Sequence, residues 1–404
     1  MNAFSFIDLI WEIFGSGLPN LEKIEKKGLL SVKIGQMFAL RIDFLTPEKC
    51  AHLARLYQNN PSLPPEDFHK LLDRCVDGGW RQHFSYIEEE PLATASVAQV
   101  HRAKLKTEQG DKDVVIKILK EDYSFRFKRD VNKVLKLFKI LIFFYPKLRK
   151  VANPIALLKM IKKDTLSELD LENEIRHQKI LKDIFFKYRD HVDLRGLQFP
   201  SLYPDLSNSQ VLVMEEIKGE TFQDKLENRT LDYQYLLNLF HLHGFYIFGV
   251  GTFHGDIHPG NIILKDNDIY FVDCGALAKV SERLRKGLFH FMKNLSFYRF
   301  DQCAKWLHYM SENRLSNAKF EQFRAKFLDL YKDFPGKSVS EISLTKKMMH
   351  TIKLGVDHGM AFGEGMFPVI KSLMYLDGMV IRCQPQAVLM EDMQSYVEEL
   401  EQYV

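Results

Sequence analysis

The sequence predicts an α+β protein, in which a small part that contains strands lies between helical parts. Two apolar runs are typical of buried strands, "VVIKIL" at 114–119 and "QVLVMEEI" at 210–217. Segments 124–150 and 154–187, which lie between these runs, have helical patterns. The outline is a small unit rich in strands followed by a larger helical one.

The same patterns divide the chain into three segments. Residues 1–88 read as short helices, with breaks at prolines and at the Gly78-Gly79 pair. Residues 89–217 carry the strands together with the inserted helices. Residues 218–404 are again mostly helical, apart from the paired short strands "NIILK" and "IYFVD". We expect a helical N-terminal extension, a small lobe and a larger, mostly helical lobe.

Composition and charge exclude several classes of protein. The chain has 404 residues, of which 46% are hydrophobic and 27% charged, as in soluble globular proteins with a sizeable core. The formal net charge of +3 is small for this length and does not indicate a nucleic-acid partner.

The termini and cysteines indicate the compartment. Five cysteines, an odd number without a CxxC pair, favour reduced thiols. The N-terminus "MNAFSFIDLIWEIF" lacks a basic segment and carries Asp8 and Glu12, which is typical of an amphipathic helix and not of a signal peptide. No apolar run approaches the roughly 20 residues that cross a bilayer. We expect a cytoplasmic protein with no transmembrane helix.

Lys117 is the charged residue within the predicted strand "VVIKIL". A buried ammonium needs an anionic partner, and the downstream segment "ELDLENE" offers Glu168, Asp170, Glu172 and Glu174. In a continuous helix, Asp170 and Glu174 would share one face. A lysine at an exposed strand edge and a solvated acidic helix face remain the alternatives at this point.

A second polar cluster is "FHGDIHPGNIIL" at 253–264, followed by "YFVDCG". Phosphoryl transfer needs a lysine on the nucleotide phosphates, a carboxylate for that lysine, oxygen ligands for Mg²⁺ and a carboxylate near the attacking oxygen. The spacing of Asp256 and Asn261 matches the kinase catalytic loop D-x-x-x-x-N, and Asp273 stands where D-F-G is expected. The order of these residues predicts an ATP site with Lys117 and Asp256 as catalytic residues and with Asn261 and Asp273 as metal ligands.

Other residues near these motifs have weaker signals. The run "VLVMEE" has the form of the linker strand that would bind adenine, with Glu215 and Ile217 at the hydrogen-bonding positions. His254 and His258 are four residues apart, but Pro259 makes this segment a loop, so we expect the histidines to brace the loop and not to bind a metal. The sequence "HGDIHPGN" differs from the "HRDLKxxN" of ordinary protein kinases and is similar to the loop of aminoglycoside and choline kinases.

Two N-terminal motifs distinguish between these classes, Lys33-Ile34-Gly35-Gln36 and "PLATASVAQVHRA". With them the chain resembles the UbiB family, also called the ABC1 or ADCK atypical kinases. The family's K-x-G-Q motif, alanine-rich loop, E-x-D motif and HxDxHPGN loop are all present, and the resemblance covers roughly residues 20–395. It implies a bilobed protein-kinase-like fold with a helical N-terminal extension that carries K-x-G-Q.

The resemblance also implies roles for single residues. Lys33 and Gln36 would pack over the active site, and Glu168 and Asp170 would be the E-x-D pair, while Asp256 would be the catalytic aspartate. Asn261 and Asp273 would hold Mg²⁺. The loop over ATP would consist of Ala93, Thr94, Ala95 and Ser96. Alanine lacks the backbone freedom of glycine, so this loop should be stiff and should disfavour a bulky protein substrate.

The sequence departs from the family pattern at several places. Thr94 replaces an alanine, Cys274 replaces the usual phenylalanine of D-F-G, and "FALRIDFLT" follows K-x-G-Q where relatives have a different form. The first two changes should tune ATP affinity without abolishing it. Many relatives carry C-terminal membrane helices that this sequence lacks, so we do not expect stable membrane anchoring.

The resemblance implies a role in the metabolism of ubiquinone or another isoprenoid lipid, as an ATPase or kinase. A small-molecule kinase of the aminoglycoside or choline type and a nucleotide-binding scaffold without turnover are the alternatives.

One segment bears on a membrane partner, residues 128–150. It mixes apolar residues with a basic set, Lys133, Lys136, Lys139, Lys147, Arg149 and Lys150. The apolar residues are Leu135, Leu137, Phe138, Ile142, Phe143 and Phe144. A basic, aromatic-bearing helix of this kind binds anionic membrane surfaces, which would bring the protein to a prenylated lipid at the inner face of a membrane. A core-packing helix with a solvated basic face has the same pattern, so both interpretations stand.

Overall fold

The computed structural model describes residues 3–39, 45–57, 62–76, 78–144, 154–363 and 365–404. The chain forms two compact units. The first unit consists of residues 1–176 and 200–216, and the second consists of residues 177–199 and 217–404. The two units are defined by contacts between residues and do not test the three segments expected from the sequence. That division therefore stays a prediction. Both units combine helices with strands, which confirms the α+β class.

The first unit contains an antiparallel sheet in the order β1-β3-β4-β6, with β2 paired to β3. Its strands are β1 (Phe84–Ile87), β2 (Ala93–Thr94), β3 (Ala98–Leu105), β4 (Lys112–Leu119) and β6 (Val211–Glu215). The two strands predicted at 114–119 and 210–217 are β4 and β6. They are neighbours, with Lys117 opposite Leu212.

Both faces of the central strands β4 and β6 are mostly buried, which explains why these two strands read as continuous apolar runs. Side chains alternate between the two faces of a strand. In β4, Val114, Ile116 and Ile118 belong to one hydrophobic cluster, while Val115 and Leu119 belong to another. Lys117 is two residues from both Val115 and Leu119, so its side chain points to the same face of the sheet as theirs.

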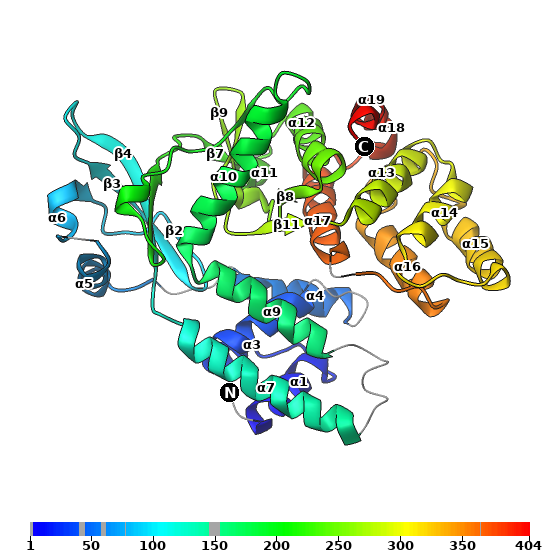
Figure 1. Cartoon of the computed structure of the whole chain (residues 1–404), viewed down its shortest axis with the longest axis horizontal. Coiled ribbons are helices and arrows are strands. Elements are labelled where there is room, and N and C mark those ends of the chain that lie inside the picture. Colours follow the sequence, from blue (N-terminus) through cyan, green and yellow to red (C-terminus); the bar gives the residue numbers. More distant parts are fainter. Residues whose placement is uncertain (1–2, 40–44, 58–61, 77, 145–153, 364) are drawn as a thin grey trace. The chain divides into compact units, whose positions relative to one another are not determined.

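Helices cover each face of the sheet in the first unit (Figure 1). The cluster of Ile116 includes Phe68 and Leu72 of α5 (Pro65–Cys75), and α6 (Trp80–His83) leads into β1. The cluster of Val115 includes residues from the helices α1 (Ala3–Phe14), α2 (Leu21–Lys26), α3 (Leu29–Ala39), α4 (Pro47–Ala54), α7 (Ser124–Phe144) and α9 (Pro154–Glu168). A 3₁₀ turn at Arg55–Tyr57 follows α4.

The prediction of a single helix over 154–187 is wrong, because the helix is interrupted within the E-x-D motif. Helix α9 ends at Glu168, and α10 (Leu171–Tyr188) begins after Asp170. The Asp170 carboxylate accepts the backbone N–H of Glu172 at 3.2 Å, as a helix N-cap does. The backbone N–H of Leu171 donates to the carbonyl of Ser209 at 2.9 Å. Asp170 thus precedes the helix of Glu174, and the prediction that both lie on one helical face is wrong.

The strands of the second unit form two small sheets. One has the order β5-β10-β9-β7, from β5 (Leu197–Gln198), β7 (Glu220–Thr221), β9 (Ile262–Lys265) and β10 (Asp268–Phe271). The other pairs β8 (Thr252–His254) with β11 (Leu277–Lys279). Strands β9 and β10 are the predicted pair, and Asp266 and Asn267 between them both have positive φ, as a type I′ hairpin requires.

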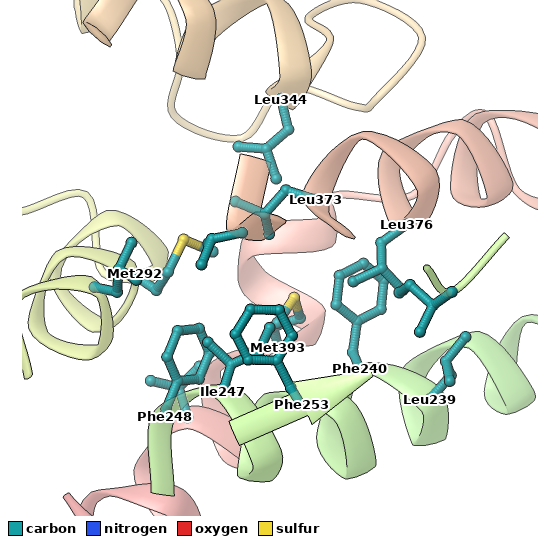
Figure 2. Packing of buried hydrophobic residues seen from close by; sticks show 14 of the residues in the cluster. Leu239, Phe240, Ile247, Phe248, Phe253, Met292, Leu344, Leu373, Leu376 and Met393 are labelled. Carbon is teal, nitrogen blue, oxygen red and sulfur yellow. The ribbon is translucent and has the colours of Figure 1, made fainter. Parts of the chain in front are cut away.

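The rest of the second unit is helical, as predicted. Its helices are α11 (Phe222–Glu227), α12 (Tyr233–Gly244), α13 (Glu282–Ser296), α14 (Phe300–Met310), α15 (Asn317–Tyr331), α16 (Leu344–Asp357), α17 (Met366–Cys383), α18 (Leu389–Asp392) and α19 (Gln394–Leu400). A π-helical segment, Phe245–Val250, extends α12, and a 3₁₀ turn, Glu401–Tyr403, follows α19. Figure 2 shows Phe240, Phe253 and Leu376 packed in one apolar cluster, so β8 and α17 share a core.

Two expectations about the whole chain can be compared with this structure. All five cysteines are free, as expected. Across the described ranges, no helix combines the length and apolar character needed to cross a membrane.

Candidate functional site

The predicted site residues are distributed over both units. The first unit holds a lysine group, which we define as Lys33, Lys117, Glu168 and Glu174, together with Gln36, the alanine-rich loop, Asp170 and Glu215. The second unit holds an aspartate group, defined as Asp256, Asn261 and Asp273, together with Ile217. Each group has its own geometry.

Lys117 forms an ion pair with Glu174, and the distance from Nζ to Oε2 is 2.7 Å. The Lys117 side chain is 12% exposed and the Glu174 side chain 3%. Charges this well buried persist only when they are paired, because desolvation penalises an isolated ion. The sequence offered four carboxylates for Lys117, and the structure selects Glu174.

Glu168 pairs with a different lysine. Its carboxylate accepts from the ammonium of Lys33, so the last residue of α9 is held by α3. Asp170 caps α10 and also accepts from the guanidinium of Arg176 at 3.3 Å. The two acidic residues of E-x-D thus stabilise the two sides of the helix break, and α10 then presents Glu174 to Lys117.

The other residues of K-x-G-Q pack α3 on the turn after α4. The Gln36 side chain, which is buried, donates to the carbonyl of Leu56 at 2.9 Å. A Cβ added at Gly35 would lie 2.6 Å from Cδ1 of Leu56, so this close approach favours glycine. The motif therefore combines a lysine that reaches Glu168 with two residues that fix the helix carrying it.

The alanine-rich loop is the tip of the β2–β3 hairpin. Ala93 and Thr94 belong to β2, and the backbone N–H of Ala95 donates to the carbonyl of Ala98 at 2.8 Å. Lys120 lies beneath this tip, and its ammonium donates to the carbonyl of Ala95 at 2.7 Å. Partial burial lowers the pKa of Lys120 from 10.5 to about 8. The sequence analysis missed Lys120, since a lysine just past a strand carries no motif.

The predicted adenine-binding positions have backbone partners already. The backbone N–H of Glu215 donates to the carbonyl of Ser201 at 2.8 Å, and the Ser201 N–H donates back to the Glu215 carboxylate at 3.0 Å. Ile217 is buried in the second unit, where its carbonyl accepts from Gly219 at 3.0 Å. Binding of adenine at Glu215 and Ile217 stays a prediction.

The aspartate group is connected through Asn261. The side-chain NH₂ of Asn261 donates to the backbone carbonyl of Asp256 at 3.0 Å. The backbone carbonyl of Asn261 accepts from the N–H of Val272 at 3.1 Å. Asp273 comes next, and its carboxylate accepts from the N–H of Gly275 at 3.0 Å. Asn261 thus ties the loop of Asp256 to the end of the strand that carries Asp273.

The histidines brace the loop, which confirms the structural hydrogen bonding predicted for them. Nδ1 of His254 accepts from the N–H of Asp256, and Nδ1 of His258 accepts from the N–H of Gly260, both at 3.1 Å. Burial lowers the pKa of His254 and keeps it neutral. Within the described part of the chain, no group of three or more His, Cys, Asp or Glu side chains could hold a metal.

Lys371 of α17 forms an ion pair with Asp256, at 3.0 Å from Nζ to Oδ1. Burial alone would raise the pKa of Asp256, but the charge and hydrogen bond of Lys371 outweigh this effect and lower it. Asp256 is therefore ionised at neutral pH. The sequence analysis missed Lys371, because it lies far downstream in a helix without a recognisable motif.

The donor set of the aspartate group fits Mg²⁺, which prefers carboxylate and amide oxygens. Asp273 supplies a carboxylate. Asn261 uses its amide nitrogen for Asp256, so its amide oxygen is the atom suited to bind a cation. A buried lysine paired with a glutamate is likewise what phosphate binding in kinases requires.

A model of the ABC1 atypical kinase-like domain matches residues 55–307. The chain belongs to the ABC1 (UbiB) family of atypical kinases. It is 26% identical over 386 residues to a probable protein kinase UbiB of Tolumonas auensis, which covers 93% of this chain and 68% of that protein. Another probable protein kinase UbiB, from Histophilus somni, is 26% identical over 393 residues, with 93% and 69% covered.

The fold of this ABC1 chain also has a counterpart among solved structures. The Rv3197–erythromycin complex from Mycobacterium tuberculosis superimposes with a TM-score of 0.58. The match has 19% identity and covers 99% of this chain and 95% of that one. Together with the family match, this similarity confirms the kinase-like α+β fold.

The pairing of the lysine group predicts the outcome of a double-mutant cycle. Lys117→Met and Glu174→Gln should each lower the free energy of unfolding by about 3–5 kcal/mol, because each leaves a buried charge or its partner site unpaired. Combined, they should show a coupling energy of about 0.5–3 kcal/mol in chemical denaturation. The matched cycle of Lys117→Met with Glu168→Gln should be additive within about 0.5 kcal/mol. Coupling to Glu168 instead of Glu174 would contradict the assignment.

The lowered pKa of Lys120 predicts how its reactivity depends on pH. Only the neutral amine is acylated, so a pKa of about 8 should make Lys120 half reactive near pH 8 in the folded protein. In urea-unfolded protein, the midpoint should return to near 10.5. Pulse acetylation from pH 6 to 11, followed by peptide mass spectrometry, measures both curves. Superimposable folded and unfolded curves would show that burial does not affect this amine.

Proposed function

We propose that this chain binds Mg-ATP and hydrolyses it, or transfers its terminal phosphate, in support of ubiquinone or other isoprenoid lipid metabolism. The observation that carries this proposal is the buried Lys117–Glu174 pair, because kinases need such a pair in place before they turn over. The fit of Asn261 and Asp273 to Mg²⁺ adds to it.

In this proposal, each group has a defined task. Lys117 holds the nucleotide phosphates, and Glu174 orients Lys117. Asp256 accepts the proton of the attacking hydroxyl or water, which its lowered pKa permits. Asn261 and Asp273 hold the magnesium ion, which supplies charge neutralisation on the phosphates when bound. The Ala93–Ser96 loop limits the approach of bulky acceptors.

The lipid pathway is supported by the names of the relatives, which are probable UbiB protein kinases. A small-molecule kinase is the second candidate, and the loop "HGDIHPGN" favours it. The K-x-G-Q helix disfavours that candidate, since Lys33 couples it to the E-x-D motif. A scaffold without turnover would not need the whole set of Lys117, Asp256, Asn261 and Asp273.

We also propose that the protein binds anionic membranes peripherally, and helix α1 supports this. Its inner face is buried through Phe6, Leu9 and Ile13. Its outer face is apolar too, with Phe4 84% and Trp11 73% exposed. Interfacial helices have aromatic side chains placed in this way.

The acidic residues of α1 do not oppose an anionic surface. Asp8 and Glu12 both pair with Lys23, at 2.9 and 3.0 Å, and Asp8 also pairs with Lys27 at 2.6 Å. These ion pairs neutralise the acidic side of the helix. What remains on its outer face is apolar.

Helix α7, which is adjacent to α1 through the Phe6–Phe138 ring contact at 5.3 Å, adds positive charge. Val131 and Val134 are buried, as in an ordinary core-packing helix. Lys133, Lys136 and Lys139 are exposed and remain available to lipid. The other basic residues of this segment, Lys147, Arg149 and Lys150, lie outside the described residues.

Mg-ATP binding should depend on Asp273. Asp273→Asn should weaken magnesium-dependent ATP binding by at least about tenfold, because it removes the charged metal ligand. Titration calorimetry with ATP, with and without Mg²⁺, measures this. The matched control is Asp268→Asn, which changes a carboxylate of the same strand region. Equal affinities of wild type and Asp273→Asn would exclude the proposed metal role.

Membrane binding should depend on the outer face of α1. Phe4→Ser with Trp11→Ser should reduce cosedimentation with anionic vesicles at low salt by at least about tenfold, since each buried aromatic contributes about 1.5–3 kcal/mol. High salt should weaken wild-type binding as well. Phe186→Ser with Val356→Ser is the matched control, because both residues are about half exposed elsewhere. Wild-type protein that stays in the supernatant at low salt would contradict the proposal.

A further inference from the structure

The catalytic loop lacks a cation at a position where ordinary protein kinases have one. In "HRDLKxxN", a lysine stands two residues after the catalytic aspartate, and in this chain His258 occupies that place. Nδ1 of His258 accepts from the N–H of Gly260, and an accepting ring nitrogen is unprotonated. The ring also packs edge-on against Tyr375, at 5.4 Å between centroids. His258 thus supports the loop and brings no positive charge to Asp256 in this arrangement.

Lys371 brings a positive charge to the same aspartate from α17. Its Nζ lies 3.0 Å from Oδ1 of Asp256, and its side chain is only 19% exposed. Nζ also lies 5.6 Å from the centroid of the Tyr375 ring, one helical turn away on α17. Asp256 and Tyr375 hold the ammonium in one position, whereas the side chain of an exposed lysine rotates freely.

The core fixes the helix that carries Lys371. Leu373 and Leu376 of α17 point into the apolar cluster with Phe240 and Phe253 (Figure 2). At 3.6 residues per turn, Lys371 and Tyr375 lie on the side of α17 opposite to these leucines. Strand β8, which leads into the loop of Asp256, contributes Phe253 to the same cluster. The ammonium and the carboxylate are therefore positioned by one shared core.

We propose that Lys371 supplies from α17 the cation that the catalytic loop lacks, holding Asp256 in place and offsetting its charge beside the phosphoryl group. This inference rests on the proposed function. The acceptor oxygen forms a bond to the γ-phosphorus, and the bond from that phosphorus to the β–γ bridging oxygen breaks with its electron pair remaining on ADP. The acceptor proton goes to Asp256, and Lys371 keeps its own proton throughout. Lys371 acts through Asp256 and is a positioning residue.

Kinetics of Lys371→Met test this role. Removing a preorganised cationic group next to the reacting atoms should lower kcat by about 10²-fold, whereas KM for ATP should rise by no more than about tenfold, in line with weaker binding of the γ-phosphate. Lys371→Arg should retain most of the activity. His258→Lys added to Lys371→Met should restore kcat at least about tenfold, because it returns a lysine to the loop position. Lys305→Met, which removes a surface partner of Asp301, is the matched control and should match wild type.

Binding measured by calorimetry gives a readout that does not depend on turnover. Without Lys371, the Asp256 carboxylate should repel a γ-phosphate, so Lys371→Met should weaken the binding of a non-hydrolysable ATP analogue about tenfold and that of ADP less than twofold. Equal losses for both nucleotides, or unchanged affinities with unchanged kcat, would overturn the inference. The inference would also be overturned if Lys371→Met were inactive, Lys371→Arg were equally inactive, and His258→Lys added to Lys371→Met restored no activity. If wild type binds neither nucleotide, the proposed function fails and this inference fails with it.

Discussion

A buried ammonium organises the first unit. Lys117 lies in a strand that is covered on both faces, so its charge requires a carboxylate at the same depth. The side-chain alternation of β4 directs Lys117 to the face covered by the N-terminal helices, α7 and α9. Glu174 must therefore approach from that side, and it does so in the first turn of α10. The start of α10 consequently determines whether the pair forms.

The family motifs then have a physical explanation as parts that fix this start. Asp170 caps α10, and Lys33 holds Glu168 at the end of α9. Gly35 and Gln36 in turn fix α3, the helix of Lys33, against the turn at Leu56. The K-x-G-Q and E-x-D motifs, which are far apart in the sequence, thus contact each other and together fix the start of α10. A change in K-x-G-Q would therefore reach Lys117 through the helix break.

Local patterns were sufficient to predict β4, β6 and the hairpin of β9 and β10 at Asp266-Asn267, because each depends on neighbours in the sequence. The break between α9 and α10 was missed, since apolar periodicity continues across Leu169. The structure reveals it through the Asp170 cap on Glu172 and the bond from Leu171 to Ser209. The partners of Lys117 and Asp256 were not predictable either. Glu174 was one of four nearby carboxylates, and Lys371 comes from a helix that tertiary packing alone brings to the loop.

Charge balance in the second unit links the loop of Asp256 to the proposed magnesium site. Asp273 lies close enough to Asp256 for its charge to oppose the ionisation of that carboxylate, and Lys371 reverses the effect. The Lys371 ammonium lies beside the Asp256 carboxylate, and the N–H of Gly275 donates to the Asp273 carboxylate. Two like charges held this close favour a bound cation over protonation when the ligands are hard oxygens. The geometry that ionises Asp256 for the proposed proton transfer is therefore the same geometry that suits Asp273 and Asn261 to the proposed magnesium ion.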